Sequence, residues 1–208
     1  MNRTKQNILT AALELFNERG SGNVSTRHIA DELGISPGNL YYHYPNKEAI
    51  IRALFDGLDK TSDAAYAFSP DAPLSLERVA EMLTVTFEIV WRYRFFYREL
   101  TLLVHNDPAL AERYRKMRGR AERDTRFVVD CAVDAGLVAA ISSDARDALT
   151  KVILVVSSYW LSFEEMGGER LQKQHVTRGV ALLISVLEPH LTPQAKKELP
   201  ALTQIAHS

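Results

Sequence analysis

The fold is decided by residues 25–47, which read STRHIADELGISPGNLYYHYPNK. Ser25 or Thr26 can cap a first short helix, and Gly34 stands where a left-handed residue commonly ends one. Ser36-Pro37 then reads as the cap and first position of a second helix. That helix is about two turns long, because Pro45 disfavours helical geometry in the residue before it. A helix, a glycine turn and a short helix form the helix-turn-helix pattern, whose second helix enters the major groove of DNA.

The same stretch resembles the tetracycline-repressor-like (TetR-type) bacterial regulators. The resemblance covers roughly the first quarter of the chain and rests on the order and spacing of Ile29-Ala30, Leu33-Gly34-Ile35-Ser36, Gly38, Leu40-Tyr41-Tyr42-His43-Tyr44 and Asn46-Lys47-Glu48. Two positions depart from the family: Tyr44, where phenylalanine is more common, and Pro37, where a charged or small residue is frequent. Tyr44 keeps an apolar ring, so we expect the same packing role. The resemblance implies an all-α fold, with a helix-turn-helix head joined to a larger helical domain for ligand binding and dimerisation.

Contacts with DNA are expected from polar side chains on and around the second helix. Its first residues and Tyr41 would face base edges, and Asn39 is the residue type best suited to bidentate recognition of adenine. The resemblance implies phosphate contacts for Tyr42, His43 and Lys47, and a base or phosphate contact for Arg27. Leu40 and Tyr44 should be buried instead; in the alternative reading, all the aromatic residues merely fill a small core. The candidate DNA-binding residues are Thr26, Arg27, Pro37, Gly38, Asn39, Tyr41, Tyr42, His43 and Lys47.

Composition places limits on the partners and the compartment. The chain has 208 residues, of which 46% are hydrophobic and 25% charged, as in an ordinary globular protein. Its formal net charge is −1, so any surface that attracts DNA must be local. The single cysteine, Cys131, excludes an internal disulfide and fits a reducing compartment. The first residues do not read as a secretory signal, and the longest apolar run, Val152–Phe163, is too short to span a bilayer. We therefore expect a cytoplasmic protein that does not associate with membranes.

The rest of the chain also reads as helical, without alternating strand patterns. An amphipathic helix over residues 4–19 precedes the motif, and a longer helix begins at Lys47 and runs through Leu58. The best linker signal is Ser69-Pro70-Asp71-Ala72-Pro73. We predict a DNA-binding domain over residues 1–48, a connecting helix and linker over 49–73, and a ligand-binding and dimerisation domain over 74–208. Helical patterns in that last part cover Leu76–Tyr93, Phe95–Val104, Pro108–Ala135, Asp144–Glu165, Val176–His190 and Gln194–Ile205.

An effector pocket is suggested by aromatic residues in the carboxy-terminal part. Phe87, Trp91 and Phe95 are spaced i, i+4 and i+8, so on one helix their rings could converge on a single cavity. Polar tips for a mostly apolar wall could come from Tyr97, His105, Tyr114 and Trp160. The alternative is that these rings are ordinary core. The identity of the effector is not encoded in any motif.

Two helical patterns, Asp144–Glu165 and Val176–His190, are apolar around more than one side. Such helices need two burial partners, one of which can be a second subunit. A dimer is favoured because palindromic DNA half-sites are read by two-fold symmetric proteins, although a monomeric bundle would also bury these helices. The resemblance adds a four-helix interface, made of the last two long helices of each subunit. The candidate interface residues are Leu149, Val152, Val156, Val180, Leu183, Val186 and Leu187.

Patterns for other chemistry are weak. The histidines have no metal-ligand spacing, no nucleophile elbow or phosphate loop occurs, and no catalytic pair can be named, so we expect neither a metal nor a cofactor. Cys131 lies beside Asp130 and Asp134, which would oppose a thiolate, so a buried structural cysteine is favoured over a redox sensor.

Three functions remain open at this point. The leading hypothesis is a dimeric transcriptional regulator, a repressor that a small-molecule effector releases from a palindromic DNA operator. The second is a constitutive or activating DNA-binding regulator without an effector. The third is an all-helical carrier or enzyme that uses the aromatic cavity.

Overall fold

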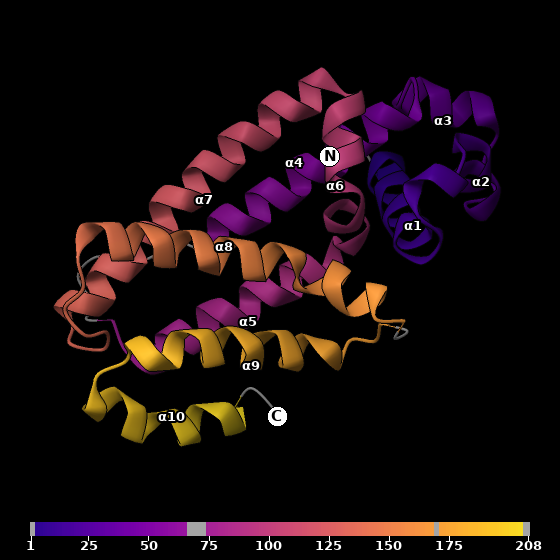
Figure 1. Ribbon diagram of the computed structural model, residues 1–208. Helices are drawn as coiled ribbons and strands as arrows, with labels where there is room; N and C mark the ends of the chain where they lie inside the picture. Colours follow the sequence, from indigo (N-terminus) through magenta and orange to yellow (C-terminus); the bar gives the residue numbers. More distant parts are fainter. Residues whose placement is uncertain (1–2, 66–73, 169–170, 206–208) are drawn as a thin grey trace. The chain divides into compact units, whose positions relative to one another are not determined.

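The computed structural model describes residues 3–65, 74–168 and 171–205, and within these ranges the chain is helical (Figure 1). The amino-terminal helices are α1 (Arg3–Arg19), α2 (Thr26–Glu32), α3 (Pro37–His43) and α4 (Lys47–Ala65), with a 3-10 turn, η1, at Ser21–Asn23. They are followed by α5 (Leu76–Arg92), α6 (Arg94–Asn106), α7 (Pro108–Asp134), α8 (Ser143–Met166), α9 (His175–Leu187), a 3-10 turn η2 (Glu188–His190) and α10 (Pro193–Ile205). The all-α prediction is confirmed, because the described residues contain no strand beyond one isolated bridge between Val138 and Leu191.

The helices expected from the sequence are all present. The helix that begins at Lys47 continues past Leu58 to Ala65, and the last turn of the predicted Val176–His190 helix is a 3-10 turn. Pro189 accounts for the second difference, because its ring cannot be accommodated in the interior of an α-helix. The predicted linker, residues 69–73, lies outside the described residues. None of the helices in the described ranges has the length and apolar character that a bilayer span requires.

The chain forms two compact units by its internal contacts. The head unit holds the described residues up to Thr61 together with Tyr93–Tyr114, and the large unit holds Ser62–Arg92 and the chain from Arg115 onward. By its contacts α6 therefore belongs to the head, although it lies in the range predicted for ligand binding. The functional division at residues 48 and 73 stays a prediction.

Aromatic packing and hydrogen bonds join α6 to the rest of the head. The ring centroids of Phe16 and Phe95 are 5.2 Å apart, and those of Phe55 and Phe96 are also 5.2 Å apart. The buried side chain of Asn17 accepts a hydrogen bond from the Phe95 amide at 3.0 Å. Because burial of a polar side chain is tolerated only when it is paired, this bond fixes the start of α6 against α1.

The large unit is built around α5, which packs against α8, α9 and α10, while α8 also packs against α9. At its centre the rings of Phe87 and Trp160 lie 5.4 Å apart. A Cβ atom on Gly179 would fall 2.5 Å from Phe87 and 2.8 Å from Trp160. Only a glycine therefore lets α9 approach these two rings so closely.

Candidate nucleic-acid interface

Helix α2 is held at its start by a reciprocal pair of hydrogen bonds. The His28 amide donates to the Ser25 hydroxyl at 3.2 Å, and the Ser25 amide donates to His28 Nδ1 at 3.3 Å. These bonds satisfy backbone donors that the start of a helix leaves unpaired. Of the two capping residues expected, Ser25 is the cap, so the Thr26 hydroxyl is not used for capping.

The turn between α2 and α3 is made by Gly34, as predicted from the sequence. Its φ of 63° lies in the left-handed region. The Ile35 amide donates back to the Ala30 carbonyl at 3.0 Å, and the Gly34 amide donates to the Asp31 carbonyl at 3.2 Å. These bonds satisfy carbonyl groups at the end of α2 and fix the direction in which the chain enters α3.

Helix α3 is short and fixed at both ends. The Asn39 amide donates to the Ser36 hydroxyl at 3.2 Å, and Pro37 occupies the first helical position. The fully buried Leu40 anchors the helix from below, and the buried Tyr44 ends it in an extended conformation before Pro45. The predicted cap, the predicted stop and the predicted burial of Leu40 and Tyr44 are confirmed. Burial also raises the pKa of Tyr44, as expected for a ring that serves packing.

The outer face of α3 carries most of the predicted base-reading residues. Pro37, Gly38 and Asn39 are exposed, and the residues Tyr41 and Tyr42 are 50% and 85% exposed. The helix contains no acidic residue, so no negative charge on it would oppose the phosphates that line the groove. His43, less exposed, packs edge to face against Tyr42 with 5.1 Å between the ring centroids. Such a surface can enter a major groove and offer an amide, hydroxyl groups and an imidazole.

Tyr41 is tied to α2 by its hydroxyl group. The hydroxyl oxygens of Thr26 and Tyr41 are 3.0 Å apart, which makes them a hydrogen-bonded pair between the first turn of α2 and the outer face of α3. No feature of sequence spacing indicated this contact, because the two residues are fifteen positions apart.

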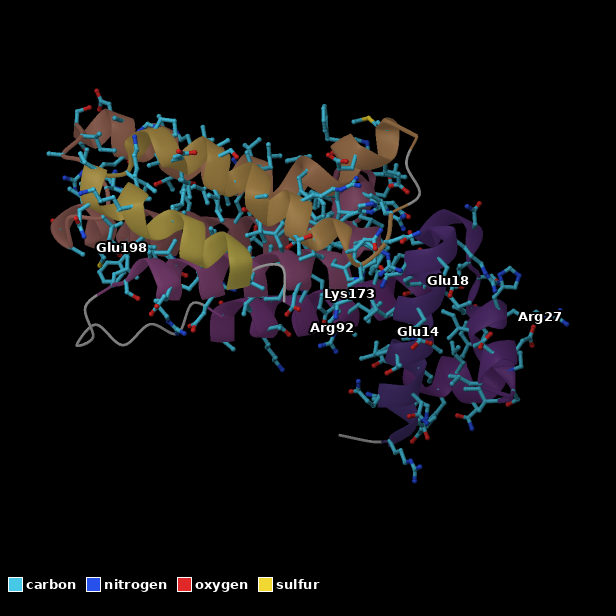
Figure 2. All side chains as sticks on the ribbon, turned by 90° about the horizontal axis from the view of Figure 1, so that it is seen from below. Glu14, Glu18, Arg27, Arg92, Lys173 and Glu198 are labelled. Carbon is cyan, nitrogen blue, oxygen red and sulfur yellow. The ribbon has the colours of Figure 1, made fainter. Side chains whose placement is uncertain are left out.

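Arg27 is the most accessible cation of the motif. Figure 2 shows its side chain projecting outward from the head. Its nearest anionic partner is Asp31, at 3.9 Å, and the two side chains are 81% and 65% exposed. An exposed pair of this kind contributes little free energy, so Arg27 can exchange Asp31 for a phosphate or a base.

Lys47 is held inside the head by its ammonium group. Its Nζ donates to the Ser21 carbonyl at 2.5 Å, and Ser21 in turn donates to the Glu99 carboxylate through its amide and its hydroxyl group. These bonds connect the start of α4 with η1 and α6. The ammonium group keeps two further protons, so the predicted phosphate contact stays a prediction beside this structural role.

The predicted effector residues divide between the two units. Phe87, Trp91 and Trp160 belong to the large unit, whereas Phe95, Tyr97, His105 and Tyr114 belong to the head unit. The expected i to i+8 relation among Phe87, Trp91 and Phe95 is wrong, because α5 ends at Arg92 and Tyr93 stands outside both helices. In the large unit the rings of Phe87 and Trp160 lie 5.4 Å apart. In the head unit the rings of Phe95, Tyr97 and Tyr114 each lie within 6.3 Å of Phe96.

The predicted dimer residues also divide. Leu149, Val180 and Leu183 are buried within the chain itself, so they have no surface to offer a partner and belong to the core. Val156, Val186 and Leu187 are partly exposed, and Val152 is exposed. The predicted set leaves out a row of exposed apolar side chains at helical spacing: Val155, Tyr159, Phe163 and Met166 on α8, with the exposed Leu182 on α9. Their spacing of three to four residues was a usable signal, but several faces of these helices are equally apolar.

Cys131 is half-buried near the carboxy-terminal end of α7. Burial, together with the charges of Asp134 and Asp130, raises the pKa of its thiol. A thiol kept protonated is a poor nucleophile, which favours a packing role.

Comparison with known proteins agrees with this geometry. A family described as bacterial regulatory proteins of the tetR family matches residues 8–54, and TetR, described as a bacterial transcriptional repressor, matches residues 59–199. The HTH-type transcriptional regulator UidR of Escherichia coli K12 is 26% identical over 156 residues, which cover 75% of this chain and 78% of that protein.

Two solved structures extend the similarity over the whole fold. A TetR-family transcriptional regulator from Marinobacter aquaeolei VT8 has a TM-score of 0.90 at 33% identity, with 100% of both chains covered. The ketosteroid transcriptional regulator KstR2 of Mycobacterium tuberculosis has a TM-score of 0.70 at 20% identity, with 92% of this chain and 97% of that chain covered. At that lower identity the likeness shows the fold alone.

Proposed function

The chain belongs to the TetR family of bacterial transcriptional regulators, and from this premise we propose that it is a homodimeric repressor that a small-molecule effector releases from a palindromic operator. The observation that carries the DNA-binding part is the outer face of α3. The helix is capped by Ser36 and anchored by Leu40, and it presents Asn39, Tyr41 and Tyr42 to solvent without an acidic neighbour on the helix. A protein that acts on the chromosome in this way would work in the cytoplasm.

Asn39 should set sequence specificity. Replacing Asn39 by alanine is expected to weaken operator binding by about 1–3 kcal/mol and binding to unrelated duplexes much less, because a bidentate contact to a base edge is lost. The test is an electrophoretic or anisotropy titration on DNA from upstream of the chain's own gene, beside an unrelated duplex of equal length. Asn7→Ala, at an exposed position on α1, is the control and should change neither affinity. An equal loss on both duplexes would show that Asn39 only positions α3, and failure of the wild-type protein to bind any duplex would remove the DNA-binding proposal.

The dimer proposal is supported by the exposed row on α8. Val155, Tyr159 and Phe163 follow one another at i, i+4 and i+8, so they share one side of the helix. Contiguous exposed apolar surface of this kind commonly marks a protein interface. Two copies of the row, together with the exposed Leu182 of α9, would make an isologous contact between two helices from each subunit.

The effector proposal is supported by an unpaired donor in the large unit. Trp160 is 3% exposed, and its indole Nε1 has no hydrogen-bond partner among the described residues. A buried donor without a partner is unfavourable, and an effector that carries an acceptor would remove that penalty. We assign the effector a carbonyl or comparable oxygen that accepts from Trp160 Nε1, on a mostly apolar skeleton that suits the neighbouring ring of Phe87.

Trp160→Phe should reduce the response to such an effector. Loss of one hydrogen bond worth about 1 kcal/mol raises the concentration needed for half-release from the operator roughly fivefold. The measurement is operator release by a panel of apolar ketones that includes a ketosteroid, on wild type and on each tryptophan variant. Trp91→Phe provides the comparison, since Trp91 is the other of the two tryptophans and is only partly buried. Equal half-release concentrations for wild type and Trp160→Phe would remove Trp160 from the effector site.

A further inference from the structure

We propose that Thr26 and Tyr41 act as a single unit in DNA recognition, in which Thr26 positions the phenol ring of Tyr41 and the pair offers one hydroxyl proton to the duplex. This inference rests on the proposed DNA binding and adds a division of labour within it. Thr26 becomes a positioning residue for specificity, although its own side chain has no need to reach a base.

The geometry fixes both members of the pair before DNA arrives. Thr26 is the first residue of α2, and the Ser25 cap holds the backbone beside it. Tyr41 follows the fully buried Leu40, so its backbone is fixed from the inner side of α3 while half of its side chain remains exposed. The 3.0 Å contact between the two hydroxyl oxygens then restricts the direction of the ring.

Tyr42 provides the contrast on the same helix. Tyr42 is 85% exposed, and its ring packs edge to face against that of His43, with 5.1 Å between the centroids. One tyrosine is therefore tied to α2 through its hydroxyl group, and its neighbour in sequence extends into solvent. If ring direction matters for reading DNA, removal of the Thr26 hydroxyl should affect the function of Tyr41 and leave that of Tyr42 unchanged.

Counting protons shows why the pair should behave as one donor. Each hydroxyl group has a single proton, and one of the two is used for the bond between them. A phosphate oxygen or a base carbonyl can only accept, so the pair has one proton left for it. A hydroxyl group that already accepts a hydrogen bond is polarised and donates more strongly. Loss of either hydroxyl removes both the tether and this strengthening.

A double-mutant cycle tests the inference. Thr26→Val keeps the side-chain shape and Tyr41→Phe keeps the ring, so each removes one hydroxyl group. Dissociation constants are measured by anisotropy, at one salt concentration, on the upstream DNA fragment that wild type binds and on an unrelated duplex. We expect each single variant to bind the specific fragment about tenfold more weakly, and the double variant to be hardly weaker than either. Thr26→Val should also lower the ratio of specific to non-specific affinity, and Thr26→Ser should restore it.

The matched cycle uses Tyr42→Phe in place of Tyr41→Phe. The loss of affinity caused by Tyr42→Phe should multiply with the loss caused by Thr26→Val, because the hydroxyl groups of Tyr42 and Thr26 are not paired with each other. Multiplied losses in the Thr26–Tyr41 cycle itself, about a hundredfold in the double variant, would overturn the inference. An unchanged specificity ratio in Thr26→Val would do the same. In either case wild-type binding would still support the proposed function, whereas a wild type that binds no duplex would reject both. Circular dichroism checks that each variant is folded. Tyr41 is exposed, so Tyr41→Phe should leave the packing of the head unchanged, and its effect on affinity can be interpreted.

Discussion

Replacing Val155 by glutamate is expected to give a folded monomer that has lost most of its affinity for the operator. Val155 lies on the outer face of α8 and is 57% exposed in the single chain, so a charge there remains solvated in the monomer. In an isologous dimer the substitution occurs twice at one interface, and each uncompensated charge would be buried. A penalty on the order of 4 kcal/mol corresponds to a dimer that dissociates about a thousandfold more readily.

Sedimentation velocity across a range of concentrations measures this effect, with thermal unfolding as the check on folding. Leu102→Glu is the matched control, because Leu102 is 60% exposed but belongs to α6 of the head unit and is not part of α8 or α9. It should leave the dimer intact. Leu183→Glu is the opposite comparison: its leucine is fully buried within the chain, so it should unfold the large unit instead of yielding a monomer. A wild-type protein that stays monomeric well above micromolar concentration would end the dimer proposal.

Gly179→Ala should destabilise the large unit by about 2 kcal/mol, even though alanine is the better helix former. The added Cβ atom would lie 2.5 Å from Phe87 and 2.8 Å from Trp160, much closer than non-bonded carbon atoms approach. Relief requires α9 to move away from α5 and α8, and overpacking of this kind costs about 1–3 kcal/mol or more. For a chain of this length, we expect the midpoint of thermal unfolding to fall by roughly 4–8 °C.

The same substitution at Gly119 provides the control. Gly119 lies inside α7, and an added Cβ atom there would meet only the end of the flexible Arg123 side chain, at 3.6 Å. Gly119→Ala should therefore stabilise the protein by up to about 1 kcal/mol through helix propensity alone. Thermal melts of both variants at one protein concentration give the comparison. A Gly179→Ala protein as stable as Gly119→Ala would contradict the close packing of α9 on the two rings.

The sequence by itself determined the local architecture of the DNA-binding motif. The caps at Ser25 and Ser36, the left-handed Gly34 and the stop before Pro45 all depend on groups within a few residues along the chain. Hydrogen-bond chemistry and steric restriction over so short a range are encoded by residue type and spacing alone. For the same reason, the outward position of Asn39 and the inward position of Leu40 could be predicted.

Only the tertiary structure decided which apolar side chains face one another. Phe95 continues the spacing of Phe87 and Trp91 in the sequence, yet a single non-helical residue, Tyr93, places it in the head beside Phe16. The hydroxyl pair of Thr26 and Tyr41 likewise depends on the angle between two helices.

The division between core and surface on α8 and α9 was decided in the same way. Both helices carry apolar residues on several sides. The hydrophobic effect is non-directional, so the sequence alone does not determine which of these sides becomes buried. Gly179 admits the rings of Phe87 and Trp160 on one side of α9, where Leu183 is buried with them in the large unit. Val155 and Phe163, no more polar than Leu183, are left exposed because none of the described helices packs over them. Whether a given apolar side chain is buried depends on which helix, from a distant part of the chain, packs over it. That packing exists only in the folded unit.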